Sequence, residues 1–175
     1  MKVRESLESD KESIRSLHKS AFDPSEAEAV SELAIDLLED KTALPILSLV
    51  VEKDGEIVGH IIFSAVSIAG ADGVSAYILS PLAVAEVAQK SGLGTRLINK
   101  GLETLKERGG EIVLVYGDPE YYRRTGFVAG HKLKPPHQLS YPEESWMAKE
   151  LVENTLATVQ GLVQCAASLN SPEHW

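Results

Sequence analysis

The most informative segment of the chain reads Gln89-Lys90-Ser91-Gly92-Leu93-Gly94-Thr95. An apolar run typical of a strand precedes it at residues 76–84, and residues 92–108 follow with apolar side chains at helical spacing. Glycines let the backbone come close to a ligand, and the free N–H groups of a helix N-terminus favour a phosphate or pyrophosphate. The segment therefore predicts an anion site, and a glycine-rich helix start that binds nothing is the alternative.

Two common phosphate-binding motifs do not fit this segment. A P-loop needs Gly-Lys-Ser/Thr at a fixed spacing, and that tripeptide is missing here. A dinucleotide fingerprint needs three glycines and an acidic residue at the end of the next strand. That strand ends in Tyr116-Gly117-Asp118, which is a weak match.

A second motif reads Tyr121-Tyr122-Arg123-Arg124-Thr125-Gly126-Phe127. It follows residues 111–116, a continuous apolar run typical of a strand buried on both faces. If this strand is parallel to the one ending at Val84, both motifs lie at the carboxyl edge of the sheet, where open α/β sheets bind ligands. A phenol there can act as a general acid. The alternative is a packed tyrosine, with Phe127 as a core residue.

The remaining pattern predicts an α+β (mixed α/β) domain. Its expected order is β-α-α-β-β-β-α-β-α-β-β, with a largely antiparallel first half and one parallel crossover through the helix that begins at Gly92. Pro81 interrupts the strand at residues 76–84 and indicates a bulge. A capping box is expected at Ser9 and Glu12. Further expected elements are a strand after Phe127, an irregular loop at residues 132–142 and a last strand at residues 146–151.

The division into parts follows from the same pattern. Residues 1–151 are expected to form one domain, and residues 152–175 a C-terminal helical tail. Val152, Leu156, Val159 and Val163 recur in the tail at helical spacing. This apolar face is expected either to pack on its own domain or to join a second copy in a homodimer.

Composition excludes several classes of protein. The 175 residues include 17 Lys and Arg and 26 Asp and Glu, so the net charge is −9. Nucleic acid and anionic membrane surfaces need a basic face, so neither is an expected partner. The single cysteine, Cys165, rules out an internal disulfide framework and is expected to be a buried structural thiol. The first residues lack the apolar core of a signal peptide and no run of 18 apolar residues occurs, so we expect a cytoplasmic location.

The two motifs together resemble the GNAT superfamily of N-acetyltransferases. The pattern Gln89-x-x-Gly92-x-Gly94 is similar to the acetyl-CoA signature of that family, and Tyr122-x-x-x-Gly126-Phe127 to its second motif. The run from Gly117 to Tyr122 most resembles the YhbS-type branch. The resemblance covers the chain from its first strand to about Leu151. It implies a mostly antiparallel sheet of about six to seven strands, flanked by helices and splayed between the fourth strand, at 76–84, and the fifth, at 111–116.

The resemblance also implies a reaction. An acetyl group would move from acetyl-CoA, the co-substrate, to a primary amine by direct attack on the thioester, without a metal. Tyr122 matches the general acid that protonates the departing thiolate. The expected cofactor-binding residues are Leu82, Ala83 and Val84 along the pantetheine arm and Gln89, Lys90, Ser91, Gly92, Leu93, Gly94 and Thr95 around the pyrophosphate.

Three points stay open at this stage. The candidates for the general base are Glu26, Glu28 and Glu32, each of which is otherwise expected to be a solvated surface residue. His131 and His137, in the Pro-rich loop, are expected either to line the acceptor site or to be ordinary surface histidines. The acceptor is a small-molecule or peptide amine of unknown identity. Many family members have an asparagine after the fifth strand, where this chain has Gly117-Asp118. A non-catalytic acyl-CoA-binding or sensing module is the alternative function.

Overall fold

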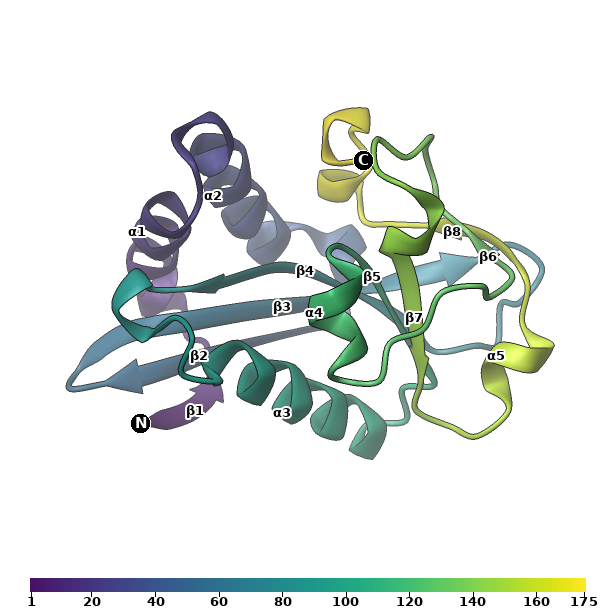
Figure 1. Ribbon diagram of the computed structural model, residues 1–175, viewed down its shortest axis with the longest axis horizontal. Coiled ribbons are helices and arrows are strands. Elements are labelled where there is room, and N and C mark those ends of the chain that lie inside the picture. Colours follow the sequence, from purple (N-terminus) through teal and green to yellow (C-terminus); the bar gives the residue numbers. More distant parts are fainter.

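The sheet organises the whole molecule. The computed structural model describes residues 1–175 (Figure 1). Six strands follow one another in the order β1-β2-β3-β4-β5-β7 and are antiparallel except for β4 and β5, which are parallel. The short strands β6 and β8 pair with each other, and β8 also pairs with β3. The strands are β1 (Lys2–Glu5), β2 (Ile46–Lys53), β3 (Glu56–Ile68), β4 (Ala76–Val84), β5 (Ile112–Tyr116), β6 (Leu133–Lys134), β7 (Trp146–Glu150) and β8 (Gly161–Gln164).

This topology confirms the expected mixed sheet and its parallel crossover through the helix after β4, and the short strands β6 and β8 form a second parallel pair. The sheet has eight strands, not six or seven, because β6 and β8 add two short strands outside the main order. No helix in the molecule is both long enough and apolar enough to cross a membrane.

Helices cover both faces of the sheet. α1 (Lys11–Ala21) and α2 (Pro24–Glu39) lie together on one face, and α3 (Leu93–Glu107) lies on the other (Figure 1). The short helix α4 (Pro119–Arg123) follows the carboxyl end of β5. Because side chains alternate across a strand, each strand feeds two cores. On β3, Ile62 joins the core under α2, whereas Ile61 and Phe63 join the core under α3.

Helix α3 sits close to the sheet at Gly101. A Cβ atom added there would overlap the Phe63 ring. Glycine at this helix position therefore lets the backbone of α3 approach β3 more closely than any other residue would allow. This close contact fixes where the N-terminus of α3 lies relative to the sheet.

The predicted helix through the tail is wrong. Helix α5 is a single turn, Thr155–Thr158, and the tail continues as β8 and two short 3₁₀ turns. Gly161 has a φ of +138°, and a Cβ there would overlap the Ala69 carbonyl oxygen, so the chain turns at this glycine and approaches the end of β3. Val159 and Val163 lie four residues apart, a spacing that places both on one face of a helix or on one face of an extended segment. Both are buried here.

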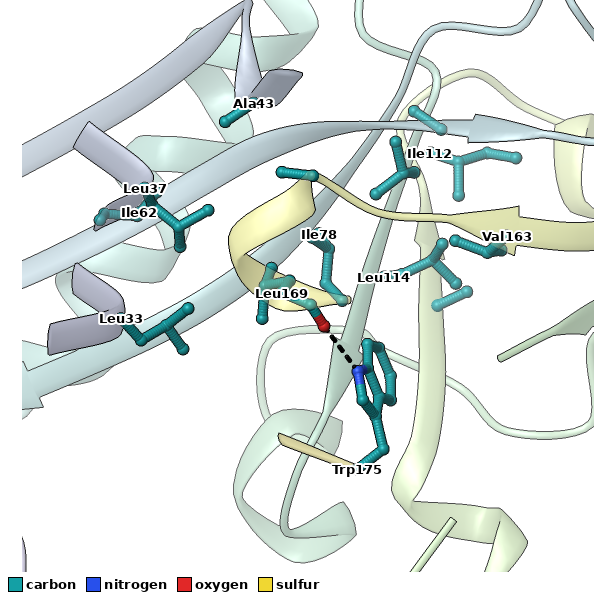
Figure 2. Packing of buried hydrophobic residues seen from close by; sticks show 14 of the residues in the cluster. Leu33, Leu37, Ala43, Ile62, Ile78, Ile112, Leu114, Val163, Leu169 and Trp175 are labelled. Atoms are coloured by element: carbon teal, nitrogen blue, oxygen red, sulfur yellow. Dashed lines mark hydrogen bonds between the residues drawn. The ribbon is translucent and has the colours of Figure 1, made fainter. Parts of the chain in front are cut away.

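The tail packs on its own domain. Val163, Leu169 and Trp175 join the core that also contains Leu33 and Leu37 of α2 (Figure 2). Trp175 is 4% exposed, and its indole N–H donates to the Leu169 carbonyl over 2.8 Å. The tail is thus a part of the core under α2.

Three local expectations differ from the structure. The strand expected after Phe127 is reduced to one isolated bridge between Val128 and Ala148. The loop at 132–142 contains the two-residue strand β6. No capping box forms at Ser9, because α1 begins at Lys11 and the Asp10 carboxylate accepts from the Leu7 N–H over 2.6 Å instead.

Candidate functional site

The sheet opens between β4 and β5. These strands pair only from Ala76 to Leu79 on β4 and from Ile112 to Val115 on β5. The register between β3 and β4 shifts between Ile61 and Phe63, opposite the segment that contains Pro81. A proline cannot donate to a ladder, so this bulge marks the point where the strands separate. Beyond it, the last residues of β4 have a free edge facing β5.

The free edge of β4 offers backbone hydrogen-bonding groups. The Ala85 N–H donates to the Val58 carbonyl of β3 over 2.8 Å. Because backbone groups alternate along an antiparallel strand, the amides of Leu82 and Val84 point away from β3, toward the opening, and the amide of Ala83 points toward β3. The Gln89 side chain donates to the Val84 carbonyl over 3.0 Å, which ties the following loop to this edge.

The loop after β4 turns directly into α3. Lys90 and Gly92 have φ values of 62° and 82°, in the left-handed region. The Ser91 hydroxyl donates to the Ala88 carbonyl. The first backbone bond of the helix runs from the Arg96 N–H to the Gly92 carbonyl over 3.0 Å, and no side chain caps the helix.

The first turn of α3 therefore holds unpaired donors. The N–H groups of Leu93, Gly94 and Thr95 have no acceptor within the chain. The Leu93 side chain is buried in the core, so only its backbone can serve a ligand. A cavity of about 770 Å³ adjoins this turn on the side of β1, and its lining includes Gly92 and Thr95, the cationic Lys2, Arg96 and Lys100, and the acidic Glu103. The unpaired N–H groups of the turn favour an anion at this end of the opening.

Tyr122 lies across the opening, on α4 at the end of β5. Its ring packs at right angles to Tyr121, with centroids 5.1 Å apart, and against the buried Phe127 at 5.8 Å. A Cβ on Gly117 would overlap the Tyr122 ring, so the glycine after β5 makes room for it. Burial raises the pKa of Tyr122 above its ordinary value of 10, and the phenol carries its proton at neutral pH.

Asp118 has a structural partner. Its carboxylate accepts from the Glu120 N–H over 3.0 Å and caps the first turn of α4. The residue that departs from the usual family asparagine thus fixes the helix that carries Tyr122.

The three candidate bases, Glu26, Glu28 and Glu32, all lie on α2. Glu28 and Glu32 are engaged in ion pairs with α1, to Lys19 at 3.2 Å and to Arg15 at 2.6 Å. Glu26 is exposed in the first turn of α2. Ion pairs with α1 thus hold Glu28 and Glu32 at the surface of the α1–α2 pair.

The two histidines near β6 bind backbone groups. His131 lies within hydrogen-bonding distance of the Trp146 carbonyl, at 3.0 Å, and accepts from the Leu133 N–H at 3.2 Å, and burial lowers its pKa. His131 lines a cavity of about 500 Å³ beside β6. His137 contacts the Asn170 carbonyl at 2.7 Å and so anchors the tail.

A buried polar chain was missed by the sequence analysis. His18 Nε2 lies 2.8 Å from His60 Nδ1, His60 Nε2 lies 2.8 Å from the Ser48 hydroxyl, and the Ser6 hydroxyl donates to Ser48 over 2.7 Å. Burial lowers the pKa of His18 to about 4 and lowers that of His60, so both rings are neutral at pH 7. His60 lies opposite Ala83 in the β3–β4 register, on the side of β4 away from the free edge.

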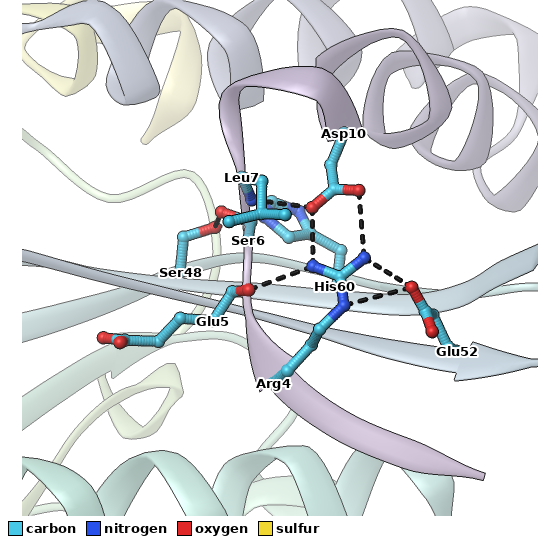
Figure 3. Close-up of polar contacts among 8 residues, drawn as sticks. All are labelled: Arg4, Glu5, Ser6, Leu7, Asp10, Ser48, Glu52 and His60. Atoms are coloured by element: carbon cyan, nitrogen blue, oxygen red, sulfur yellow. Dashed lines mark hydrogen bonds and ion pairs between the residues drawn. The ribbon is translucent and has the colours of Figure 1, made fainter.

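An ionic cluster of Arg4, Asp10 and Glu52 lies beside these hydrogen-bonded His and Ser side chains (Figure 3). Arg4 donates to Asp10 over 2.7 Å and to Glu52 over 2.5 Å. Hydrogen bonds from Arg4 hold the pKa of Asp10 below its usual range. No group of three or more His, Cys, Asp and Glu side chains is arranged to hold a metal ion.

Comparisons with known proteins give a consistent assignment. The model of the acetyltransferase (GNAT) family matches residues 11–127. YjhQ, an uncharacterised N-acetyltransferase of Escherichia coli K12, is 39% identical over 165 residues, which cover 90% of this chain and 88% of YjhQ. YhbS of the same strain, also an uncharacterised N-acetyltransferase, is 33% identical over 169 residues, covering 94% and 95% of the two chains.

Two solved structures extend the comparison to three dimensions. YhbS from Escherichia coli in complex with CoA superposes with a TM-score of 0.87 at 31% identity, covering 97% of this chain and 92% of YhbS. A GNAT family acetyltransferase from Brucella melitensis in complex with acetyl-CoA gives 0.72 at 31% identity, covering 96% and 97%. With its matching family model, its relatives and its splayed sheet, the chain belongs to the GNAT family of acetyltransferases.

Proposed function

We propose that the protein transfers an acetyl group from acetyl-CoA to a primary amine by direct attack on the thioester. The observation that carries this proposal is the junction of the free edge of β4 with the uncapped first turn of α3, across from Tyr122. This arrangement fits a long thioester with an anionic end. The complexes of the relatives with CoA and acetyl-CoA support the same ligand.

The cofactor would lie along β4 with its phosphates at α3. The pantetheine amides would pair with the outward backbone groups of Leu82 and Val84, as an added strand pairs with a sheet edge. The pyrophosphate would accept from the amides of residues 93–95. Lys90 is exposed beside this turn and would add a charge-assisted contact.

The thioester would then lie near the open end of β4. An outward N–H group of Leu82 or Val84 would donate to its carbonyl oxygen and stabilise the charge that develops there. As the C–S bond breaks and the C–N bond forms, Tyr122 would donate its proton to the thiolate, and the proton lost from the amine nitrogen would pass to solvent, from which the phenol regains one. A thiol of ordinary pKa, near 8.5, is a fair leaving group that benefits from such a donor.

The amine would approach from the face that α1 and α2 cover. The first turn of α3 lies on the other face and is assigned to the cofactor, so the acceptor needs the remaining entrance. We propose a small-molecule or peptide amine as the acceptor. The exposed Glu26 and the net charge of −9 suit a cationic one.

The experiment that tests this proposal compares the native chain with Tyr122→Phe in a thiol-release assay over a panel of primary amines. We expect turnover to fall by about 10²- to 10⁴-fold while acetyl-CoA affinity changes little, because only the transferable proton is removed. Tyr141→Phe is the control, since Tyr141 is exposed and its contacts with Tyr116, at the end of β5, are made by its ring and backbone rather than by its hydroxyl. Binding of acetyl-CoA without thiol release for any amine would instead indicate a non-catalytic acyl-CoA-binding or sensing module.

A further inference from the structure

Tyr121 reaches the opposite wall of the opening from its neighbour Tyr122. It stands on α4 at the end of β5, yet its hydroxyl oxygen lies against Gly94 in the first turn of α3. A Cβ atom added to Gly94 would overlap that oxygen and would lie 3.8 Å from Cγ2 of Val84. Tyr121 thus connects α4 with the first turn of α3, at a point where Val84 of β4 is also close to Gly94.

The hydroxyl of Tyr121 has polar surroundings on the α3 side. The Thr95 side chain and the positive charge of Arg124 both act on it and favour a lower pKa. Partial burial is the largest influence and raises the pKa of Tyr121, so the hydroxyl keeps its proton at neutral pH and can donate it in a hydrogen bond. The ring itself packs against the core under α3 and edge-on to Tyr122.

We propose that Tyr121 is a cofactor-binding residue whose hydroxyl donates to the pyrophosphate of acetyl-CoA at the first turn of α3. This inference rests on the proposed function. The hydroxyl lies against Gly94, in the turn whose Leu93, Gly94 and Thr95 amides are unpaired, so an anion held by those three amides is within reach of a fourth donor from the other wall. The adjacent tyrosines then divide the work: Tyr122 faces the thioester and Tyr121 the phosphates.

The contact with the Tyr121 hydroxyl explains why residue 94 is glycine. Its φ is ordinary, so the backbone conformation does not demand glycine. What excludes a larger residue is the Tyr121 hydroxyl, since the next nearest atom, Cζ of the same ring, is 3.4 Å from the Cβ position. Gly94 and Tyr121 therefore form one unit.

The first test measures acetyl-CoA affinity by calorimetric titration of the native chain, Tyr121→Phe and the control Tyr141→Phe. Acetyl-pantetheine, which lacks the pyrophosphate, is titrated in parallel by NMR. Loss of a hydrogen bond to a charged group is expected to weaken acetyl-CoA binding by about tenfold or more in Tyr121→Phe alone. Binding of acetyl-pantetheine is expected to be equal in all three proteins.

Two results would overturn the inference while leaving the proposed function intact. One is unchanged acetyl-CoA affinity in Tyr121→Phe. The other is an equal loss for both thioesters, which would show that the hydroxyl orders the opening without contacting phosphate. Failure of the proposed function looks different, because the native chain itself would then bind neither thioester, or would bind acetyl-CoA without releasing thiol to any amine.

A second test uses the glycine. Gly94→Ala is expected to lower both the melting temperature and the acetyl-CoA affinity, because its methyl group collides with the Tyr121 hydroxyl. In the double variant Gly94→Ala/Tyr121→Phe the collision is gone, and the melting temperature is expected to recover. No recovery would show that Tyr121 does not occupy the place above Gly94, and would overturn the inference.

Discussion

Cys165 is the only thiol in the chain, and its surroundings bear on whether an acyl-enzyme route is open. Burial raises its pKa to about 12, so the reactive thiolate is scarce at neutral pH. The residue lies in the tail and packs against the core under α2. These surroundings agree with direct transfer from the thioester to the amine.

The corresponding prediction concerns Cys165→Ala. Because the thiol is protonated and packed against the core, we expect the variant to keep the native rate of thiol release from acetyl-CoA and to lose at most modest stability. The native thiol is also expected to react with iodoacetamide much more slowly than free cysteine at pH 7.5. A loss of turnover in a folded Cys165→Ala protein would contradict direct transfer.

Individual residues also show what could be predicted from the sequence. The turn at residues 89–95 and the phenol at Tyr122 were recognisable because each motif is local. The His18–His60 contact joins residues 42 positions apart, and no spacing rule connects a helix to a strand at that distance. The role of Tyr121 was hidden for a similar reason, since only the fold brings it to Gly94.

Among the elements, α3 would hold the cofactor's phosphates in the proposed function, and its position depends on its close contact with β3. Gly101→Ala would place a methyl group inside the Phe63 ring, so α3 must move outward. We expect unfolding by urea to report a loss of about 1–3 kcal/mol, the usual cost of overpacking. Acetyl-CoA affinity should fall as well, because the first turn of α3 moves with the helix.

Gly73→Ala is the matched control for Gly101→Ala. No atom lies within 4 Å of a Cβ at Gly73, and its φ is not in the left-handed region. We expect that variant to keep native stability and affinity. Equal behaviour of the two variants would show that α3 is not held at Gly101.

In the tail, the spacing of apolar residues predicted a helix that the structure does not have. Val152, Leu156, Val159 and Val163 fit a helix by spacing, but β-branched side chains also favour strands. Gly161 decided the outcome, because its left-handed φ turns the chain into β8. Pairing with β3 and β6 is a long-range effect that the local spacing of apolar residues does not contain.

The end of the tail is expected to contribute strongly to stability. Trp175 stacks on Tyr116 with ring centroids 5.7 Å apart and fills the core beside Leu169. Trp175→Ala should lower the free energy of unfolding by about 3–5 kcal/mol, as large-to-small core changes do. A loss below 1 kcal/mol would show that the tail is not a structural part of the core.

For the whole molecule, the neutral histidine pair predicts a dependence of stability on pH. The pKa of His18 is about 4 in the folded state and near 6.5 in the unfolded chain. When folding lowers the pKa of a group, the free energy of unfolding is highest above the pKa of the unfolded chain. It falls as the pH drops from that value toward the pKa of the folded state. We therefore expect stability to decline from about pH 6.5 toward pH 4.

Urea unfolding of the native chain and of His18→Gln at several pH values checks this. One extra proton taken up on unfolding gives a slope of up to about 1.4 kcal/mol per pH unit, and the variant should show a shallower slope in the same range. The charged neighbours Asp10, Arg4 and Glu52 remain in both proteins, so their contribution cancels. Identical slopes would show that His18 does not titrate on unfolding.

The central claim is that the opening between β4 and β5 is an acetyl-CoA site. Calorimetric titration of the native chain with acetyl-CoA tests it most directly, with desulfo-CoA and NAD as companions. We predict saturable binding of one acetyl-CoA per chain, similar binding of desulfo-CoA, and none of NAD. Absence of acetyl-CoA binding, or equal binding of NAD, would contradict the claim and leave the Gly92-x-Gly94 turn as a helix start only.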